Sequence, residues 1–235
     1  MALPEVVGRD EWLAARRELL EREKAARREL DSVNAERRRL PMVRIDKPYQ
    51  FEGASGTVGL AELFEGRPQL IVQHVMFGPD WDAACPSCTA GIDEMAPALL
   101  DHLANRGTTF ALVSRAPYAK LAAYADARGW RIPWYSSAGD DFNFDFAVSF
   151  DEAVQPPVYN YRALPVVDTS ELPGVSCFLA ADGAVFHTYS TYARGTDFGG
   201  AYAWLDLTAL GRQEDWEEPK GRADHARAAV PDFAV

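Results

Sequence analysis

The sequence of 235 residues has few cysteines and no long apolar run. Three cysteines, an odd number, do not suit the disulfide framework of a secreted protein. No segment approaches the run of about 18 apolar residues that would predict a membrane-spanning helix. The N-terminus, MALPEVVGRDEW, lacks the basic and apolar segments of a signal peptide. We therefore expect a cytoplasmic protein without a membrane partner.

The sequence also lacks an excess of positive charge. It has 24 Lys and Arg residues against 35 Asp and Glu residues, a formal net charge of -11. Nucleic acids attract basic surfaces, so we expect no nucleic-acid partner. Glycine-rich phosphate loops, GxSxG motifs and HExxH motifs are absent, so the sequence has no signature of nucleotide, serine-hydrolase or zinc-protease chemistry. The hydrophobic content of 48% suffices for one medium-sized globular domain.

The sequence does contain a CxxC motif, formed by Cys85 and Cys88 in the run FGPDWDAACPSCTAGIDEMAPALL, residues 77–100. The preceding run QLIVQHVMF is apolar and β-branched, as in a buried parallel strand, which we place at 70–77. Beyond the motif, apolar residues recur at helical spacing: Ile92, Met95, Leu99 and Leu103. The motif therefore lies where a strand gives way to a helix, which we expect to continue to about Asn105.

This placement predicts different roles for the two thiols. Pro86 suits the first position of a helix, because its missing N–H would have no partner there. Cys85 would then stand at the helix N-terminus, where free N–H groups and the helix dipole stabilise a thiolate and lower its pKa. We expect Cys85 to be the nucleophile and Cys88, one turn later, to be the resolving thiol.

A purely structural role for the motif fits the sequence less well. A structural zinc site needs four ligands, and the remaining candidates are Cys177 and four scattered histidines. A disulfide that spans four residues would be short and strained, and such bonds tend to be the labile, functional ones. We therefore expect redox chemistry by the two cysteines, without a metal or an organic cofactor.

Residues 9 to about 40, with ten Lys or Arg and eight Asp or Glu, predict one long charged helix that ends at Pro41. One row of residues at seven-residue spacing is mainly apolar: Trp12, Leu19, Ala26, Val33 and Leu40. The companion row is mostly polar: Arg16, Glu23, Leu30 and Arg37. A coiled-coil seam needs two apolar rows. Two alternatives stay open: a surface helix lying on its own domain, and an arm that packs on a second subunit of a homodimer.

Strands and helices alternate through the middle of the chain. We expect a short strand at 43–51, then a turn and a brief helix capped by Ser55 or Thr57. The run TTFALVS at 108–114, after the CxxC helix, has the pattern of a buried strand. A helix then follows, so that the order is βαβα. This order implies parallel strands joined by right-handed crossovers.

The second half of the chain begins with that helix, at 117–128, for which Gly129 is the expected stop. Later, Asp182 and Gly183 join two strands, since Asp-Gly is a strong signal for a tight hairpin. A last helix is expected at about 200–210.

These elements define the domain organisation. We expect an N-terminal helical arm at 1–41 and one α/β domain at 42–211. That domain carries an irregular insertion at about 136–174. A polar C-terminal tail, 212–235, completes the chain.

The order strand, CxxC helix, strand, helix, hairpin, helix is that of the thioredoxin fold. GASGTVGLAELFEGRPQLIV, SRAPYAKLAAYADARGWRIPWYSS and the series Pro79, Asp80, Trp81, Cys85 resemble peroxiredoxins and alkyl hydroperoxide reductases. The N-terminal helix and the segments CPSCT, DFNFDF, HTYSTYARG and YAWLDLT resemble the thioredoxin-like bacterial family catalogued as domain of unknown function 899, over nearly the whole chain. The resemblance implies an α/β thioredoxin-like fold, with a central mixed sheet flanked by helices. It also implies a redox centre, without defining a substrate.

The sequence departs from the better-known relatives near the expected site. Asp82 stands where common peroxiredoxins carry a threonine that orients the peroxide, and its charge would repel a thiolate. The strand before the motif offers Gln73 and His74 in place of the buried acid of thioredoxins. Strand residues alternate in facing, so at most one of these two can face the cysteines. We therefore expect disulfide exchange to be faster than peroxide reduction.

Four further residues are candidates for the site. His187 would act as a proton shuttle or a copper ligand beside the cysteines, although a lone histidine on a strand is more often structural. Arg115 follows a strand at the sheet edge where ligands gather, and it would bind a carboxylate, steady the Cys85 thiolate or form a loop ion pair. Trp81 and Trp134, with neighbouring aromatic residues, would wall an apolar substrate pocket or cover the core under the insertion.

From these residues we predict an intracellular thiol-disulfide oxidoreductase that uses Cys85 and Cys88, with a thiol or disulfide as substrate or electron donor. One alternative is a peroxiredoxin-like thiol peroxidase that uses the same two residues. Another is a metal-binding or dimeric scaffold protein without turnover. The oxidoreductase needs a reversible disulfide between the two cysteines, whereas the peroxidase needs a sulfenic acid on Cys85.

Overall fold

The computed structural model describes residues 6–164, 169–193, 200–213, 218 and 220, with residues 200–202 described by their backbone alone. An eight-stranded mixed sheet forms the core, in the order β1-β10-β9-β4-β5-β6-β2-β3. Its strands are β1 Val43–Arg44, β2 Gln50–Gly53, β3 Gly56–Gly59, β4 Gln69–His74, β5 Thr108–Ser114, β6 Trp134–Ser136, β9 Gly174–Ala181 and β10 Ala184–Tyr192. A second small sheet pairs β7 Val158–Tyr159 with β8 Arg162–Ala163.

The centre of the sheet has the topology that the sequence predicts. β4 pairs in parallel with β5 and antiparallel with β9, and β9 pairs antiparallel with β10. The order β10-β9-β4-β5, with β4 and β5 joined through the CxxC helix, is the arrangement of the thioredoxin fold. All seven residues of β5 are buried, as expected for a central parallel strand. The predicted α/β thioredoxin-like fold with its long N-terminal helix is therefore confirmed.

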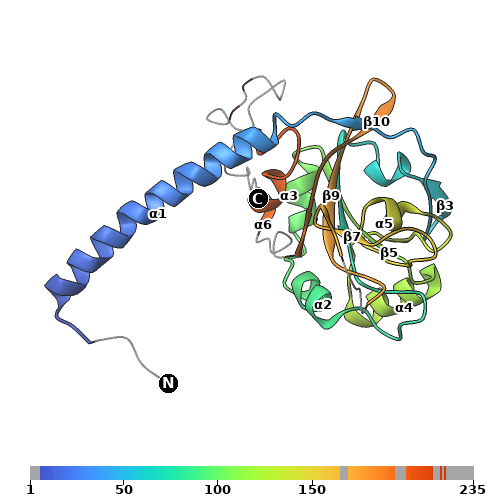
Figure 1. The fold of residues 1–235 in the computed structure, drawn as a ribbon, viewed down its shortest axis with the longest axis horizontal. Helices are drawn as coiled ribbons and strands as arrows, with labels where there is room; N and C mark the ends of the chain where they lie inside the picture. Colours follow the sequence, from blue (N-terminus) through green and yellow to red (C-terminus); the bar gives the residue numbers. More distant parts are fainter. Residues whose placement is uncertain (1–5, 165–168, 194–199, 214–217, 219, 221–235) are drawn as a thin grey trace, which may run out of the picture.

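Helices cover both faces of this sheet (Figure 1). They are the 3-10 helix η1 Glu62–Phe64, α2 Pro86–Asp93, α3 Leu99–Ala104, α4 Tyr118–Arg128, α5 Phe142–Asp145 and α6 Gly200–Leu205, whereas a further helix, α1 Arg9–Arg37, does not cover the sheet. Because strand residues alternate, Ile71 of β4 packs in one apolar cluster while Leu70 and Val72 pack in another. The first cluster includes residues of α2, α3 and α6, and the second includes residues of η1 and α5.

Several local predictions are confirmed. The expected strand at 108–114 is β5, and α4 ends at Gly129, which adopts the left-handed conformation of a helix stop. Asp182 and Gly183, with φ of 51° and 73°, form the turn between β9 and β10. Two positive φ angles are typical of the type I′ turn that fits the twist of a hairpin.

Three local predictions are wrong. The strand expected at 43–51 is two strands, β1 and β2, which lie on opposite sides of the central strands of the sheet. The single helix expected to reach Asn105 is two helices, α2 and α3, because Pro97 has no N–H to donate and disfavours helical backbone at the residue before it. The segment after position 53, for which we expected a turn and a helix, instead forms β3, which pairs with β2 in a hairpin. Gly56 has a φ of 94° in the turn of this hairpin. Thr57 consequently lies on β3, and the helix that follows is the three-residue η1.

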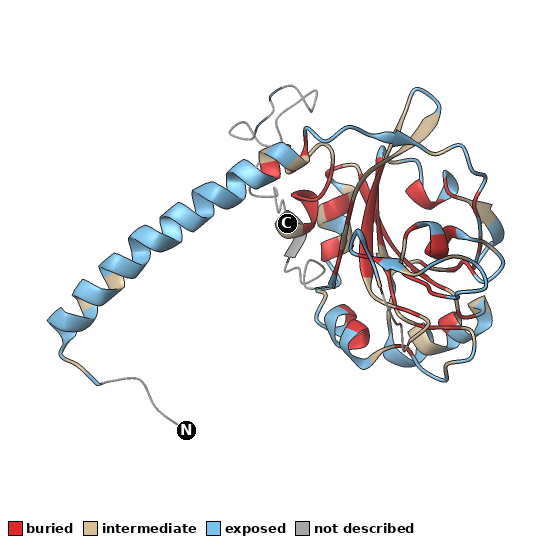
Figure 2. Cartoon of the chain, in the orientation of Figure 1, coloured by how far each residue is buried: buried red, intermediate tan, exposed pale blue. Residues whose placement is uncertain are grey.

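The 29-residue helix α1 extends away from the sheet (Figure 1), and its surface is exposed along nearly its whole length (Figure 2). Asn34 is its one buried residue. Contacts with the domain come from the C-terminal end, where the Arg37 guanidinium donates to the Asp206 carbonyl at 3.0 Å and lies over the Tyr189 ring. The interpretation of this segment as a helix lying on its own domain is therefore wrong. Neither α1 nor any other described helix has both the length and the apolar composition to cross a membrane.

Candidate functional site

The CxxC motif lies at the end of the loop that connects β4 to α2, as predicted. Cys85 is the N-cap residue of α2 and Pro86 occupies the first helical turn. The Cys85 N–H donates to the Met76 carbonyl at 2.9 Å, and its own carbonyl accepts from the Thr89 N–H at 2.9 Å. These bonds fix both ends of the motif at the carboxyl edge of the parallel strands, where α/β sheets commonly gather ligands.

The two thiols differ in burial. Cys85 is half-buried, whereas Cys88 is 8% exposed and belongs to the apolar cluster under α2. Burial raises the pKa of Cys88 to about 11; a hydrogen bond with the Met76 backbone opposes this shift, and a charge on Cys85 adds to it. Cys88 is therefore a neutral thiol at pH 7, and Cys85 is the thiol that a reagent reaches first.

The loop before Cys85 is held by a residue that the sequence did not suggest. Lys120, from α4, donates to the carbonyls of Pro79 and Trp81, each at 3.0 Å. Trp81 is half-buried and folds back over Gly78, where an added Cβ would lie 3.0 Å from the indole nitrogen. Lys120 thus positions Trp81 and the approach to Cys85, but a lone exposed lysine in a helix carries no sequence signal for that role.

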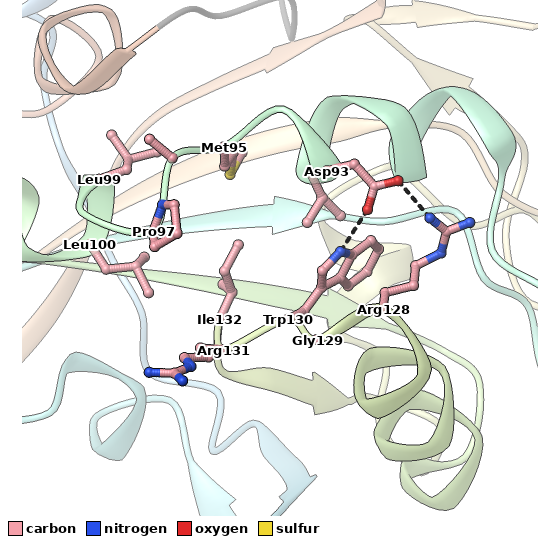
Figure 3. A pocket seen from close by; sticks show the side chains of 12 residues that line it. Asp93, Met95, Pro97, Leu99, Leu100, Arg128, Gly129, Trp130, Arg131 and Ile132 are labelled. Atoms are coloured by element: carbon pink, nitrogen blue, oxygen red, sulfur yellow. Dashed lines mark hydrogen bonds and ion pairs between the residues drawn. The ribbon is translucent and has the colours of Figure 1, made fainter.

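Hydrogen bonds to α4 and to the residues that follow it hold α2 in place. The hydroxyls of Thr89 and Tyr124 share a hydrogen bond at 3.0 Å. At its C-terminal end, Asp93 accepts from Arg128 at 2.5 Å and from the Trp130 indole at 2.8 Å (Figure 3). Beside these two contacts is a cavity of about 510 Å³, lined by residues such as Met95, Leu99, Leu100 and Ile132 (Figure 3). This cavity lies at the opposite end of α2 from Cys85, so we do not assign it to the thiol chemistry.

Arg115 forms an ion pair, as one of its three alternatives predicted. Its Nη1 lies 3.5 Å from Glu171 Oε1, and its guanidinium stacks over the Phe144 ring. Glu171 is almost fully buried and accepts from the Ser149 hydroxyl at 2.6 Å. Burial raises the pKa of Glu171 to about 7, and hydrogen bonding to Ser149 and the Arg115 charge only partly offset it.

Trp134 lies in the core. It is 6% exposed, and its indole donates to the Ser114 hydroxyl at 3.0 Å. Its ring packs against those of Phe77, Tyr124 and Trp130. Three aromatic residues that follow it in the sequence are also buried: Phe142, Phe144 and Phe146. These four aromatic residues are therefore buried, whereas Trp81 is half-buried, and a role of Trp81 and Trp134 in substrate binding stays a prediction.

His187 lies on the opposite face of the sheet from the cysteines. It is hydrogen-bonded to Ser190 at 2.8 Å and packs against the rings of Phe146 and Phe178 in the second apolar cluster. Within the described part of the chain, no group of three or more His, Cys, Asp or Glu side chains could hold a metal ion. The interpretation of His187 as a copper ligand beside Cys85 and Cys88 is therefore wrong, because strand alternation directs it the other way.

The strand before the motif divides its two polar residues between the faces. His74 is buried against Phe142 and Phe146, is hydrogen-bonded to Ser176 at 2.9 Å, and has a pKa lowered by burial to about 3. Gln73 alternates with His74 and so faces the cluster that contains Cys88. Its Oε1 atom is buried without a hydrogen-bond partner among the described residues. Neither residue is the ionisable acid that thioredoxins carry there.

Tyr159, in the insertion, is a site residue that sequence reasoning missed. Its hydroxyl donates to the Pro173 carbonyl at 2.7 Å and accepts from the Ala193 N–H at 2.8 Å. Burial raises the pKa of Tyr159, the hydrogen bond from the Ala193 backbone opposes this shift, and a charge on Cys88 adds to it. Asp82, by contrast, is exposed to solvent, which screens its charge from the cysteines.

Comparisons with known proteins identify a family. The family described as bacterial protein of unknown function (DUF899) matches residues 1–228. Among solved structures, peroxidoxin BcpB from Mycobacterium tuberculosis is 13% identical with a TM-score of 0.46, over 66% of this chain and 86% of that chain. An uncharacterized thioredoxin-like protein from Porphyromonas gingivalis is 18% identical with a TM-score of 0.42, over 66% and 83%. A search of curated proteins found no match.

Proposed function

Because the chain belongs to this family of bacterial proteins of unknown function, we propose its activity from the site itself: thiol-disulfide exchange, with Cys85 as nucleophile and Cys88 as resolving thiol. The difference between the two thiols carries the proposal. One is half-buried at a helix start, and the other is a buried neutral thiol one turn away. A dithiol oxidoreductase needs two such thiols, because one sulfur must be accessible to attack the substrate and the other must stay protonated until the mixed disulfide has formed.

The reaction begins when the Cys85 thiolate attacks one sulfur of a substrate disulfide. The substrate S–S bond breaks, its other sulfur leaves as a thiolate that takes a proton, and Cys85 is left in a mixed disulfide. Cys88 then loses its proton and attacks Cys85 Sγ, which releases the second substrate thiol and leaves a Cys85–Cys88 disulfide. Two electrons pass from the protein dithiol to the substrate, and a dithiol reductant restores the protein.

The electrostatics of the pair favour this order. A charge on Cys85 raises the pKa of Cys88, so Cys88 stays protonated while Cys85 is a thiolate. Once Cys85 is bound in the mixed disulfide it carries no charge, and that contribution to the pKa of Cys88 disappears. Cys88 therefore becomes more acidic at the step in which it must attack.

We also propose a reducing compartment, the cytoplasm, as the place of this activity. All three cysteines are free thiols in the structure, and a dithiol acts as a reductant only where a reductant regenerates it.

Turnover of hydroxyethyl disulfide with dithiothreitol as reductant tests the proposal. Cys85→Ser should reduce turnover to the background rate, and Cys88→Ser should trap a mixed disulfide on Cys85 that mass spectrometry detects. Cys177→Ser is the matched control, because that thiol is buried in the core and should leave turnover unchanged. Full turnover by Cys85→Ser would refute the assignment. Faster reaction with hydrogen peroxide than with the disulfide would make thiol peroxidase the better description.

A further inference from the structure

The break between α2 and α3 forms one wall of the cavity at the C-terminal end of α2. The sequence predicts one continuous helix here, and Pro97 interrupts it. Within the linker, the Met95 N–H donates to the Ile92 carbonyl at 3.0 Å. The Leu99 N–H donates to the Ala96 carbonyl at 2.9 Å. All five residues line the cavity, whose volume of about 510 Å³ is in the range of pockets that hold small molecules.

The second wall is aromatic and firmly held. Trp130 follows α4, and its backbone N–H donates to the Ala125 carbonyl at 3.0 Å. Its ring packs against Tyr124 at 5.7 Å and Trp134 at 5.6 Å between centroids. Its indole N–H donates to Asp93 at 2.8 Å (Figure 3). Because these contacts fix the ring before any ligand arrives, binding at this wall costs little conformational entropy.

The charged residues that line the cavity are two arginines and one aspartate. Asp93 forms an ion pair with Arg128 at 2.5 Å, so these two charges balance each other. Within the described part of the chain, the side chain of Arg131 has no hydrogen-bond or ion-pair partner. Figure 3 shows the Arg131 guanidinium apart from the pair of Asp93 and Arg128. The lining therefore carries a net positive charge, although the formal net charge of the whole chain is -11.

We propose that this cavity binds a small apolar carboxylate, of which medium-chain alkyl carboxylates are the simplest members. Leu99, Leu100 and Ile132 give the apolar part of such a ligand a surface from which water is released on binding. The planar Arg131 guanidinium is suited to donate two parallel hydrogen bonds to a carboxylate. A neutral apolar ligand would contact the same walls but leave the charge of Arg131 without a partner. The proposal is independent of the thiol chemistry.

Methionine methyl signals in nuclear magnetic resonance spectra report binding at this site directly. The chain has four methionines, Met1, Met42, Met76 and Met95, and of these Met95 lines the cavity. Decanoate is titrated into full-length protein that carries carbon-13 in its methionine methyl groups. The Met95 signal, assigned with Met95→Leu, should shift saturably while the Met42 signal stays in place. Absence of a saturable shift at Met95 would overturn the proposal.

Decanol, which has the same chain length without the charge, tests the role of Arg131. The ratio of the affinity for decanoate to the affinity for decanol should fall about tenfold in Arg131→Met, the weight of roughly one charge-assisted hydrogen bond. Arg162→Met is the matched control, because it removes an exposed arginine of β8 that does not line the cavity. It should leave the ratio unchanged. An unchanged ratio in Arg131→Met, or equal changes in the two variants, would overturn the proposal.

Two further variants test the apolar wall and the identity of the occupant. Leu100→Gln changes a half-buried wall residue to a polar one of similar size, so it should weaken the binding of both ligands. Unchanged affinities in Leu100→Gln would show that the ligands bind elsewhere and would overturn the proposal. The combined variant Trp12→Ala and Leu19→Ala, which removes exposed apolar side chains of α1, should bind decanoate as the unmodified protein does. Tighter binding by that variant would show that the arm of a second copy covers the cavity, and it would overturn the carboxylate as the occupant.

Discussion

Helices α1 and α2 differ in length and in burial. Their comparison shows that a long helix can contribute little to the packing of the domain, while a short one contributes much. α1 has 29 residues and buries one of them, whereas α2 has eight residues and buries Cys88, Thr89 and Ile92. The ion pairs along α1, such as Arg16 with Glu23, are exposed, and such pairs contribute little. α2 is stable because it packs on the sheet, since a free helix of its length would not form in water. The site therefore depends on packing, and the arm does not.

The largest expected difference concerns reactivity within α2. A pKa of about 11 leaves about one part in 1000 of Cys88 ionised at pH 8, and the thiolate is the reactive form. Iodoacetamide should therefore label Cys85 first, and the labelling rate of Cys88 should rise steeply between pH 8 and pH 11. Peptide mass spectrometry at timed intervals measures both rates. Faster labelling of Cys88 at pH 8 would reverse the assigned roles.

Stability should show the next largest contrast. Ile92→Ala removes a side chain that is 2% exposed, and we expect it to lower the free energy of unfolding by about 2–4 kcal/mol. Arg17→Ala, the control on α1, shortens an exposed side chain and should cost less than about 0.5 kcal/mol. Urea unfolding followed by circular dichroism gives both values. Similar losses would show that α1 is packed in solution.

The buried carboxyl of the insertion should produce a smaller, pH-dependent effect. The pKa of Glu171 is about 7 in the folded protein and near 4.5 when unfolded, so its contribution to stability falls as pH rises from 4.5 to 7. His74 acts in the opposite sense, because its folded pKa of about 3 makes stability fall as pH drops below 6.5. Glu171→Gln should therefore steepen the loss of stability from pH 7 to pH 5, by at most about 1.4 kcal/mol per pH unit.

Chemical unfolding of the Glu171→Gln variant at several pH values measures this slope. Glu152→Gln, which changes an exposed acid of the same insertion, is the control and should leave the slope unchanged. A Glu171→Gln slope identical to that of the control would show that Glu171 is ionised in the folded protein at pH 5.

The smallest effect on domain stability should come from removal of the arm. We propose that α1 pairs with a second copy of this chain, because it exposes large apolar residues such as Trp12 (53%) outside the domain. Deletion of residues 1–31 keeps the contacts of Arg37 and Arg38 with the domain. The melting temperature of the domain should change little, while light scattering should show the mass of a dimer fall to that of a monomer.

Two outcomes would refute the arm as an interface: a full-length chain that is monomeric, or a truncated chain that stays dimeric. Trp12→Ala combined with Leu19→Ala should weaken the dimer, whereas Arg17→Ala, on the same exposed helix, should leave it intact. Sedimentation at several concentrations distinguishes these variants.

Much of the fold could be predicted because the relevant chemistry is local. Pro86 at a helix start and Gly129 at a helix end each act through their own backbone preferences. The same holds for Asp182 and Gly183, whose positive φ angles form the turn of the hairpin. The continuous apolar run of β5 predicts a strand that is buried on both faces. The sequence by itself therefore determined the order of the central strands and of the helices between them, the position of both cysteines and the thioredoxin-like class.

Tertiary structure alone decided which side chains surround the cysteines. The pairing of the strands places the side chains of His187 and His74 on one face of the sheet and that of Gln73 on the other. Lys120 and Tyr159 act on the site through hydrogen bonds to residues more than ten positions away in the chain. No local pattern encodes such contacts, because they depend on how the insertion and α4 pack against the sheet. The physical reason is the distance along the chain over which each effect acts. Backbone preferences act over a few residues, whereas the surroundings of a thiol consist of segments that are far apart in the sequence.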